Sequence, residues 1–347
     1  MNYLQEIAIT LGRGIEKKAD RGYMTLCPCC GSSTANLKLW RTEIGDIRGK
    51  CINGCRTRDV LTEVRNLEKK IAAQPPGSNM ETDSRVMGIT ETELLQKDIL
   101  EPRLLLHPFL TEECISMLYA GKGTGKTWLG IDIGIALSRD SPTGIKIGPW
   151  EVKNGCGVLY VDGELPESRI RKVIKLLTKG MGDRGECSKT NELRIFSAIA
   201  KEKTENTKYN LKDEGFRNRI TTHFDTKKSC RLLILDNITS LTSGIPLSSQ
   251  QHWDPINDWL KYLRGRGIST IMIHHTNKSG EYLGTSSLDR HIDTTIRVDR
   301  VGEEADQVCL KIKFDKCRDM SPGQGKSFTL QLVGDEKSGL KFEQITA

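Results

Sequence analysis

A glycine-rich turn, Gly121-Lys-Gly-Thr-Gly-Lys-Thr127, limits the possible folds of this chain more than any other stretch. The apolar residues before it, 116–119, predict a short buried strand, and the apolar run 128–137 predicts a helix. A strand, a glycine-rich turn ending in Lys-Thr and a helix form the arrangement of a phosphate-binding P-loop. Glycines leave backbone N–H groups free to surround phosphate oxygens, and the helix N-terminus adds partial positive charge. The stretch therefore predicts a nucleotide site.

Within this motif, Lys126 has the length and charge to reach the β- and γ-phosphates, and the Thr127 hydroxyl can ligate Mg²⁺. The motif usually begins with glycine, whereas this chain has Ala120, a small residue that is expected to keep the turn. An ordinary glycine-rich strand–helix turn is the less favoured alternative. ATP and Mg²⁺ are the expected cofactors. The residues expected to contact the nucleotide are Gly121, Lys122, Gly123, Thr124, Gly125, Lys126, Thr127 and Trp128.

Three apolar strands that end in polar residues follow the P-loop helix. The first leads to Glu164, the second ends in Asp236 and the third in His275. Strands that alternate with helices predict an α/β fold with a mostly parallel sheet, whose functional groups lie at the carboxyl ends of the strands. Apolar segments from residue 294 onward predict β additions at one edge of that sheet. The polar, lysine-rich segment 198–229 is expected to be a surface excursion or mobile loop.

Each of these strand ends has an expected role beside a bound nucleotide. Asp236 is expected to hold Mg²⁺ together with Thr127. Glu164 is the expected general base, which orients and deprotonates the attacking water. His275 is expected to hydrogen-bond the γ-phosphate or that water. The alternatives are a helix cap for Asp236, a surface acid for Glu164 and a core or capping residue for His275.

Five of the eleven cysteines lie between Cys27 and Cys55, and the others are scattered singly. The pairs Cys27/Cys30 and Cys51/Cys55 have the short spacing with which four thiolates close one tetrahedral Zn²⁺ site. Cys29 could compete with Cys30, and spacing alone leaves that choice open. Such a cluster in a chain with an expected cytoplasmic location favours metal binding and reduced thiols over disulfides.

The residues around the cysteines predict a small zinc ribbon. Residues 35–40 and 46–50 predict two strands, and the apolar spacing in residues 2–20 predicts a helix before them. A module of this size would scarcely fold without its metal. The polar stretch that follows contains Pro75-Pro-Gly and no apolar period, so it predicts a flexible linker. The expected organisation is a zinc-ribbon domain at 1–68, a linker at 69–88 and an ATPase domain at 89–347.

Charge and hydropathy restrict the partners and the location. The net charge is +7, and residues 1–70 carry 13 Lys and Arg against 8 Asp and Glu. A basic N-terminal module favours a polyanionic partner, although a merely solvated surface explains the charge equally well. The chain has no apolar run of 18 residues and no signal-peptide pattern at its start. We therefore expect a cytoplasmic protein with no membrane partner.

The stretch Cys27-Pro-x-Cys-Gly31, the two expected strands and the second cysteine pair resemble the zinc ribbon of bacterial and phage primases. In that family, His often stands at the position of Cys30. The resemblance implies contact with single-stranded DNA through stacking and phosphate pairing. The alternative is an exposed polar sheet face with Trp40 packed on the preceding helix. No primase catalytic core is recognisable downstream. The residues expected to bind DNA are Trp40, Arg41, Arg48, Lys50, Arg56 and Arg58.

From about Ile89 to the C-terminus the chain resembles RepA-type hexameric replicative helicases of the RecA superfamily. The matching stretches are 120–129, 158–166 and 273–280, together with Gly284-Thr-Ser-Ser. The family often has Arg before that last motif, where this chain has Leu283. The resemblance implies a RecA-like core that assembles as a homo-oligomeric ring, with six subunits as one option. DNA would lie in the pore, where Lys278 is expected to contact it.

The pair Lys316 and Arg318 resembles the Lys-x-Arg that several RecA-type rings insert into the ATP site of a neighbouring subunit. Cations supplied in this way stabilise the charge that develops on the γ-phosphate. A solvated pair at a strand end is the alternative. We therefore count both residues as expected catalytic groups.

Together these features predict a Mg-ATP-dependent, DNA-acting ATPase. The favoured interpretation is a ring-forming replicative helicase of a phage, plasmid or integrated element, with a primase or replication initiator as a partner. The alternative is an ATP-switched DNA-binding regulator or repair and recombination mediator that does not unwind duplex. In a third interpretation the ribbon mediates protein contacts and binds no DNA.

Overall fold

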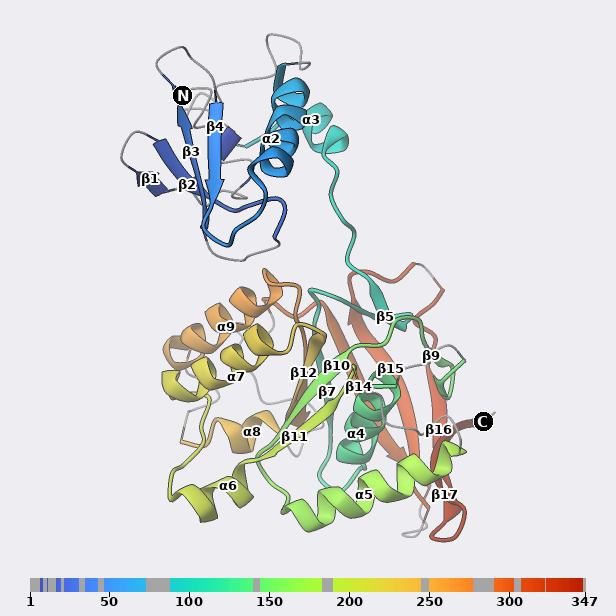
Figure 1. Cartoon of the computed structure of the whole chain (residues 1–347). Coiled ribbons are helices and arrows are strands. Elements are labelled where there is room, and N and C mark those ends of the chain that lie inside the picture. Colours follow the sequence, from blue (N-terminus) through green and yellow to red (C-terminus); the bar gives the residue numbers. More distant parts are fainter. Residues whose placement is uncertain are drawn as a thin grey trace. The chain divides into compact units, whose positions relative to one another are not determined.

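The chain forms two compact units, Met1–Asp98 and Ile99–Ala347, each with its own core. The computed structural model in Figure 1 gives the arrangement of helices and strands within each unit. It describes residues 7–8, 11, 17–19, 22–30, 35–42, 47–72, 88–139, 144–182, 190–244, 250–276, 290–302, 307–321 and 323–345.

A four-stranded antiparallel sheet, in the order β1-β2-β3-β4, forms the first unit. One face of the sheet packs Leu37 and Leu39 against Val60 and Val64 of helix α2. Side chains alternate between the two faces of a strand, so the residues between these leucines point the other way. The two strands expected between the cysteine pairs are present as β3 and β4. The elements are β1 (Lys17–Ala19), β2 (Gly22–Thr25), β3 (Leu37–Arg41), β4 (Ile47–Cys51) and α2 (Thr57–Ala72).

The helix expected over residues 2–20 is wrong in its last part. Residues 7, 8 and 11 are helical, but Lys17–Ala19 form strand β1 and pair with β2. Glycines at positions 12 and 14 disfavour helix there, so pairing with a neighbouring strand prevails.

Helix α2 continues to Ala72, and a short helix, α3 (Glu91–Gln96), lies before the end of the first unit. The expected linker overlaps the end of α2, and its residues 73–87 lie outside the described residues. The domain boundaries stay predictions.

The second unit is built on a nine-stranded sheet in the order β11-β10-β12-β13-β7-β14-β15-β16-β17. The first six strands are parallel to one another, and the last three are added antiparallel at one edge. This confirms the α/β fold with a mostly parallel sheet and β additions. The strands are β7 (Ile115–Ala120), β10 (Gly157–Asp162), β11 (Leu193–Ser197), β12 (Cys230–Asp236), β13 (Ser269–His275), β14 (Thr294–Val301), β15 (Cys309–Cys317), β16 (Phe328–Asp335) and β17 (Gly339–Ile345).

Helices cover both faces of this sheet (Figure 1). Alternate residues of each central strand enter one of two cores, as Tyr160 and Leu159 of β10 illustrate. Strands β7 and β10 are buried along their whole length, as in parallel sheets covered on both sides. Among the described helices, none is both long and apolar enough to cross a lipid bilayer. Helices α4 (Lys126–Leu137) and α5 (Glu167–Gly180) pack in one core; α6 (Ala198–Glu205), α7 (Glu214–Thr226), α8 (Ile238–Leu241) and α9 (Gln250–Arg264) pack in the other.

A smaller antiparallel sheet, in the order β6-β5-β9-β8, packs on the same core as α4. The apolar segment before the P-loop strand belongs to this smaller sheet as strand β5. The ring of Phe109, in the turn between β5 and β6, contacts the ring of Trp150 in β9, with ring centroids 4.9 Å apart. The strands are β5 (Leu104–His107), β6 (Leu110–Thr111), β8 (Lys146–Ile147) and β9 (Trp150–Val152).

The surface excursion expected over residues 198–229 is wrong. Two helices fill most of it, and the side chains of Ser197 and Asp213 cap their N-termini. In α7, the apolar residues Phe216, Ile220 and Phe224 recur every four residues and are buried. The rest of α7 consists mostly of polar residues, and lysines lie before and after the helix in the chain, so the composition of the segment hid its helical period.

The packing of α7 predicts the stability of a truncated variant. Phe216 is 3% exposed, so Phe216→Ala should lower the free energy of unfolding by about 3–5 kcal/mol, because it leaves a cavity in the core. Denaturant titration measures this change. Asn218, exposed on the same helix, is the control, and Asn218→Ala should cost less than about 0.5 kcal/mol. Equal stabilities of the two variants would show that α7 does not pack as described.

Candidate functional site

The glycine-rich turn joins β7 to α4, as expected of a P-loop. Gly123 and Gly125 have φ values of +70° and +110°, a left-handed conformation that favours glycine. Gly125 is the N-cap of α4 and has no side chain that could cap the first turn. The backbone N–H groups at this helix N-terminus therefore suit an anionic ligand such as a phosphate.

Lys126 is 5% exposed and lies along the turn. Its Nζ donates hydrogen bonds to the carbonyl oxygens of Ala120, at 2.9 Å, and Gly121, at 2.6 Å. Burial lowers the pKa of Lys126 to about 8, while the nearby carboxylates of Asp236 and Glu164 oppose that shift. A phosphate beside the ammonium group would favour its charged form further.

The strand ends expected to carry the chemistry converge beside this turn. Asp236 is the last residue of β12, and the neighbouring strand β13 ends in His275, which pairs with Ala120 of β7. Glu164 follows the end of β10, and its Oε2 lies 3.6 Å from Nε2 of His275. Parallel pairing thus brings these three side chains to the edge of the sheet where the P-loop lies.

Asp236 is held by two hydroxyl groups, one of which the sequence interpretation missed. The Tyr160 hydroxyl donates to Oδ2 of Asp236 at 2.6 Å, and Thr127 also forms a side-chain hydrogen bond with this carboxylate. Burial raises the pKa of Asp236, and both hydrogen bonds and the charge of Lys126 counteract the increase. Tyr160 lies in an apolar strand, where the sequence offers no signal that separates it from a core residue.

Asp162 and Asn237 also belong to the site and were not expected. Asp162 Oδ1 accepts hydrogen bonds from the backbone N–H groups of Glu164, at 2.8 Å, and of Leu165. Burial raises the pKa of Asp162 to about 7, and the charge of Asp236 adds to the shift. Asn237 Nδ2 donates to Oε2 of Glu164. The sequence could have pointed to both residues by their position. Asp162 ends the strand that leads to Glu164, and Asn237 directly follows Asp236.

The donor set fits Mg²⁺. Asp236 and Thr127 supply carboxylate and hydroxyl oxygens, the hard ligands that this ion prefers. Asp162 and Asp236 are register partners on adjacent strands, and both carboxylates are buried. A divalent cation would offset the repulsion between two such groups.

A comparison with protein families decides the class of this chain. Residues 81–281, more than half of the chain, match the family model AAA_25, described as "AAA domain". The matched range includes the P-loop, Glu164, Asp236 and His275. The chain belongs to the AAA domain family. ATP and Mg²⁺ are therefore the cofactors of the site, and the AAA domain is a P-loop ATPase.

Two other comparisons do not define the class of this chain any further. Among curated proteins, none matches this AAA-domain chain. A solved structure of a KaiC-like protein from the hyperthermophilic archaeon Pyrococcus horikoshii OT3 shares 14% sequence identity with it. The alignment covers 69% of this chain and 93% of that one, with a TM-score of 0.47.

Lys316 and Arg318 lie at the other end of the sheet from the P-loop of their own AAA domain. Lys316 pairs with Thr295 near the start of β14, and the start of β14 pairs with the start of β7. Arg318 Nη1 donates to Oδ1 of Asp293 at 3.2 Å. Neither residue can complete the ATP site of its own chain, and a role in a neighbouring subunit stays a prediction. Lys278 lies outside the described residues.

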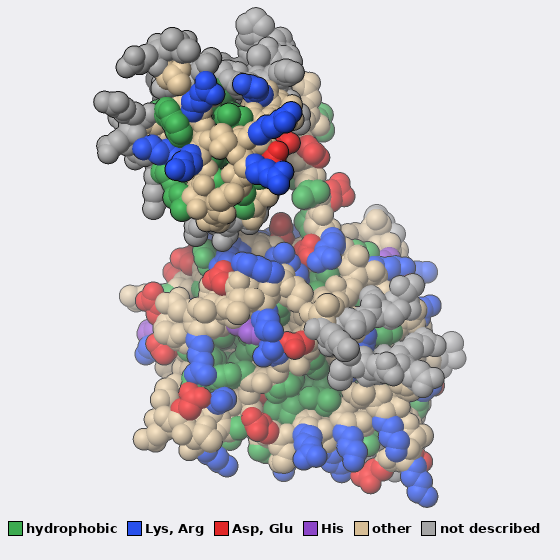
Figure 2. All heavy atoms as spheres, viewed as in Figure 1, with side chains coloured by type: hydrophobic (Ala, Val, Ile, Leu, Met, Phe, Trp, Pro, Cys, Tyr) green, Lys and Arg blue, Asp and Glu red, His purple; other side chains and the backbone are tan. Residues whose placement is uncertain are grey.

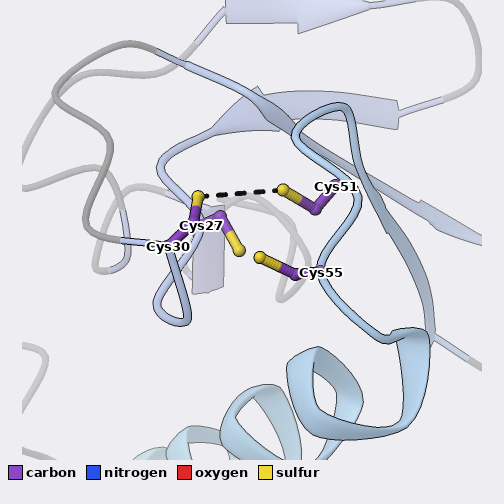
Figure 3. A group of neighbouring side chains, drawn as sticks. All are labelled: Cys27, Cys30, Cys51 and Cys55. Atoms are coloured by element: carbon purple, nitrogen blue, oxygen red, sulfur yellow. Dashed lines mark hydrogen bonds between the residues drawn. The ribbon is translucent and has the colours of Figure 1, made fainter.

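Four thiols converge in the first unit of this AAA-domain protein (Figure 3). Their sulfur atoms all lie within 4.8 Å of one another, and those of Cys30 and Cys51 are 3.8 Å apart. Four sulfurs at about 2.3 Å from one Zn²⁺ ion lie about 3.8 Å apart, so the arrangement fits a tetrahedral site. Cys29 is exposed and does not belong to this group. The group consists of Cys27, Cys30, Cys51 and Cys55.

The surroundings of the thiols suit metal binding as well. Asn36 Nδ2 donates to Sγ of Cys30 at 3.0 Å, while its Oδ1 accepts the backbone N–H of Cys27 at 3.0 Å. Outer hydrogen bonds of this kind orient metal ligands. Burial raises the pKa of the Cys27 thiol to about 12 and that of Cys55 to about 11. A bound cation would reverse this shift, because it favours thiolate.

The residues expected to contact DNA lie mostly on one surface of the first unit. Trp40 of β3 pairs with Arg48 of β4, and Lys38 pairs with Lys50 in the same register. These positions alternate with buried Leu37 and Leu39, so they share the face directed away from the core. Arg56 and Arg58 are exposed at the start of α2, and for Arg41 only the backbone is described.

The hydrogen bond to Asp236 predicts how the enzyme responds to Mg²⁺. Tyr160→Phe removes the hydroxyl that orients this carboxylate, so half-maximal ATP hydrolysis should need about 10-fold more Mg²⁺. Hydrolysis rates across a Mg²⁺ titration measure the shift. Tyr262, 54% exposed, is the control, and Tyr262→Phe should behave like wild type. An unchanged Mg²⁺ requirement in Tyr160→Phe would contradict this role.

Proposed function

We propose that this chain is a Mg-ATP-dependent ATPase that acts on single-stranded DNA, as a ring-forming replicative helicase of a phage, plasmid or integrated element. The observation that carries the DNA part is the basic face of β3 and β4, where Trp40 lies opposite Arg48 and Lys38 lies opposite Lys50. We call this surface, Lys38, Trp40, Arg48 and Lys50, the basic face.

The basic face gathers positive charges that an anion would stabilise. Like charges directly opposite one another destabilise a pair of strands, as Lys38 and Lys50 do here. Arg56 and Arg58 add positive charge at the N-terminus of α2, where the helix dipole is already positive and Asp59 in the first turn offsets part of it. Figure 2 shows Lys and Arg side chains gathered on the visible face of this unit. Phosphates of a polyanion would offset both repulsions.

The aromatic residue within the basic face favours a single strand over a duplex. In a single strand the bases are accessible, and they stack on aromatic side chains while cationic neighbours pair with the phosphates. Trp40 is partly exposed, and it lies two residues after Lys38 on β3 and opposite Arg48 on β4. This combination matches what the resemblance to primase zinc ribbons implies.

The residues of the ATP site have separate tasks in hydrolysis. Lys126 binds the β- and γ-phosphates, and Thr127 and Asp236 hold Mg²⁺, which neutralises phosphate charge. Glu164 orients the attacking water and accepts its proton, since its carboxylate lies beside the P-loop. His275 detects the γ-phosphate.

The position of two cations supports the proposed ring. Lys316 and Arg318 are remote from the P-loop of their own chain, so their proposed role in hydrolysis is at the ATP site of an adjacent subunit. There they stabilise charge on the γ-phosphate and make hydrolysis depend on assembly. Lys278 contacts DNA in the pore, and a primase or replication initiator is the partner that such a ring would serve.

One Zn²⁺ ion per chain is expected at the cysteine cluster. Cys51→Ser should abolish zinc binding and unfold the first unit, because the four thiolates close its core. Elemental analysis of purified protein measures the zinc content. Cys29→Ser is the matched control, since its thiol is exposed outside the cluster, and it should retain zinc. Loss of zinc from Cys29→Ser, with retention in Cys30→Ser, would reassign the ligand.

The test of the proposed function is ATP hydrolysis with and without single-stranded DNA across a range of protein concentrations. A DNA-acting ring should be stimulated by DNA and should show a steep dependence on concentration, because assembly completes its sites. Unwinding of a forked duplex then separates a helicase from an ATP-switched regulator. An ATP hydrolysis rate that is the same with and without single-stranded DNA would refute the proposal.

Variants of the basic face show where DNA binds. Arg48→Ala and Lys50→Ala should each reduce the slope of log affinity against log salt by about 1, because each removes one phosphate contact. Lys146, exposed on the second unit, is the control, and Lys146→Ala should leave the slope unchanged. Equal slopes in all variants would indicate that the ribbon contacts proteins instead of DNA.

A further inference from the structure

The side chain of Asn237 connects two residues of the ATP site that come from different strands. It follows the last residue of β12 and is 1% exposed. Its Nδ2 donates to Oε2 of Glu164 and lies 3.0 Å from Nε2 of His275. The side chain of Glu164 is 56% exposed, whereas that of His275 is 19% exposed. A buried amide thus holds an exposed carboxylate.

The orientation of this amide is determined by its third partner. Asn237 Oδ1 accepts the backbone N–H of Ser240 at 2.9 Å and so caps helix α8. A flipped amide would direct Oδ1 at the carboxylate of Glu164 and an NH₂ group at the N–H of Ser240. Both contacts would then be repulsive, so the donor side must face Glu164.

The same geometry determines how His275 uses its ring. An amide nitrogen only donates, so in this contact Nε2 of His275 is the acceptor. Any ligand that engages Nε2 must compete with Asn237. A change at His275 therefore reaches the amide that holds Glu164.

We propose that Asn237 is a positioning residue that holds Glu164 in place as the general base and links it to His275. The inference rests on the proposed roles of these two residues. Glutamate has several rotamers of similar energy, and an exposed one samples them freely unless a partner selects one. Asn237 makes that selection from a buried, capped position. Because its side chain is buried and its Nδ2 lies against Glu164 and His275, its effect on hydrolysis passes through these two residues.

Two substitutions separate this role from the helix cap. Asn237→Ser and Asn237→Asp keep an oxygen for the N–H of Ser240, since Ser and Asp are good N-caps, but remove the two amide N–H donors that face Glu164 and His275. The value of kcat for ATP should fall about 10- to 100-fold, because a misplaced base costs that much, while KM stays within about twofold. The loss should be larger for Asp, whose charge repels Glu164.

Asn210→Asp is the matched control. The Oδ1 of Asn210 accepts the N–H of Lys212 at 2.9 Å, and its Nδ2 donates to the carbonyl of Ser243 at 2.8 Å. The substitution therefore changes amide to acid at a half-buried, hydrogen-bonded position outside the site, and it should leave kcat unchanged. Binding of a fluorescent ATP analogue establishes that each variant is folded.

A double variant tests whether the effect passes through Glu164. In single-turnover assays of the full chain, Glu164→Gln should be strongly impaired, and adding Asn237→Ser should cause no further loss. Independent structural effects would multiply instead. Wild-type kcat in Asn237→Ser beside an impaired Glu164→Gln, or multiplied losses, would overturn the inference.

These outcomes are distinct from those of the proposed function. Unimpaired hydrolysis in Glu164→Gln would remove the general base and the positioning role together. Failure of DNA to stimulate hydrolysis would refute the DNA-acting ATPase, yet it would leave the comparison of Asn237 and Glu164 variants intact.

Discussion

Parallel pairing of β12, β13 and β7 is the constraint on which the ATP site depends. The register aligns Asp236 with Ile273, and His275 with Ala120, so the acid, the imidazole and the P-loop reach the same edge. A shift of one residue in any pair would direct these side chains to the opposite face. The continuous apolar runs of the strands hold the register, because both faces are buried under helices.

Burial also determines which charges are stable at the carboxyl ends of these strands. Asp162 and Asp236 are buried side by side with one buried cation, Lys126, nearby. Carboxylates in such a setting need hydrogen bonds or cations to remain charged. Tyr160 and two backbone N–H groups supply part of that stabilisation, and a bound Mg²⁺ would supply the rest.

Local patterns predicted much of the candidate site because each expected residue follows its own apolar strand. The P-loop, Asp236 and His275 could be found in this way, and so could the β additions at the sheet edge. Tyr160 could not, since its partner lies on a strand 76 residues later in the chain. Asn237 is adjacent to an expected residue, but its contacts come from two other strands. The helix α7 was missed because its apolar stripe is narrow among many charged residues.

The distance between the P-loop and the Lys316–Arg318 pair within one chain gives each subunit two unlike ends. Contacts that join unlike ends are heterologous, so they close into a ring only when the rotation per subunit divides a full turn, and otherwise extend as a filament. In the proposed ring, the number of complete ATP sites would then depend on closure. A closed ring would have as many sites as subunits, whereas an open chain of subunits would have one fewer.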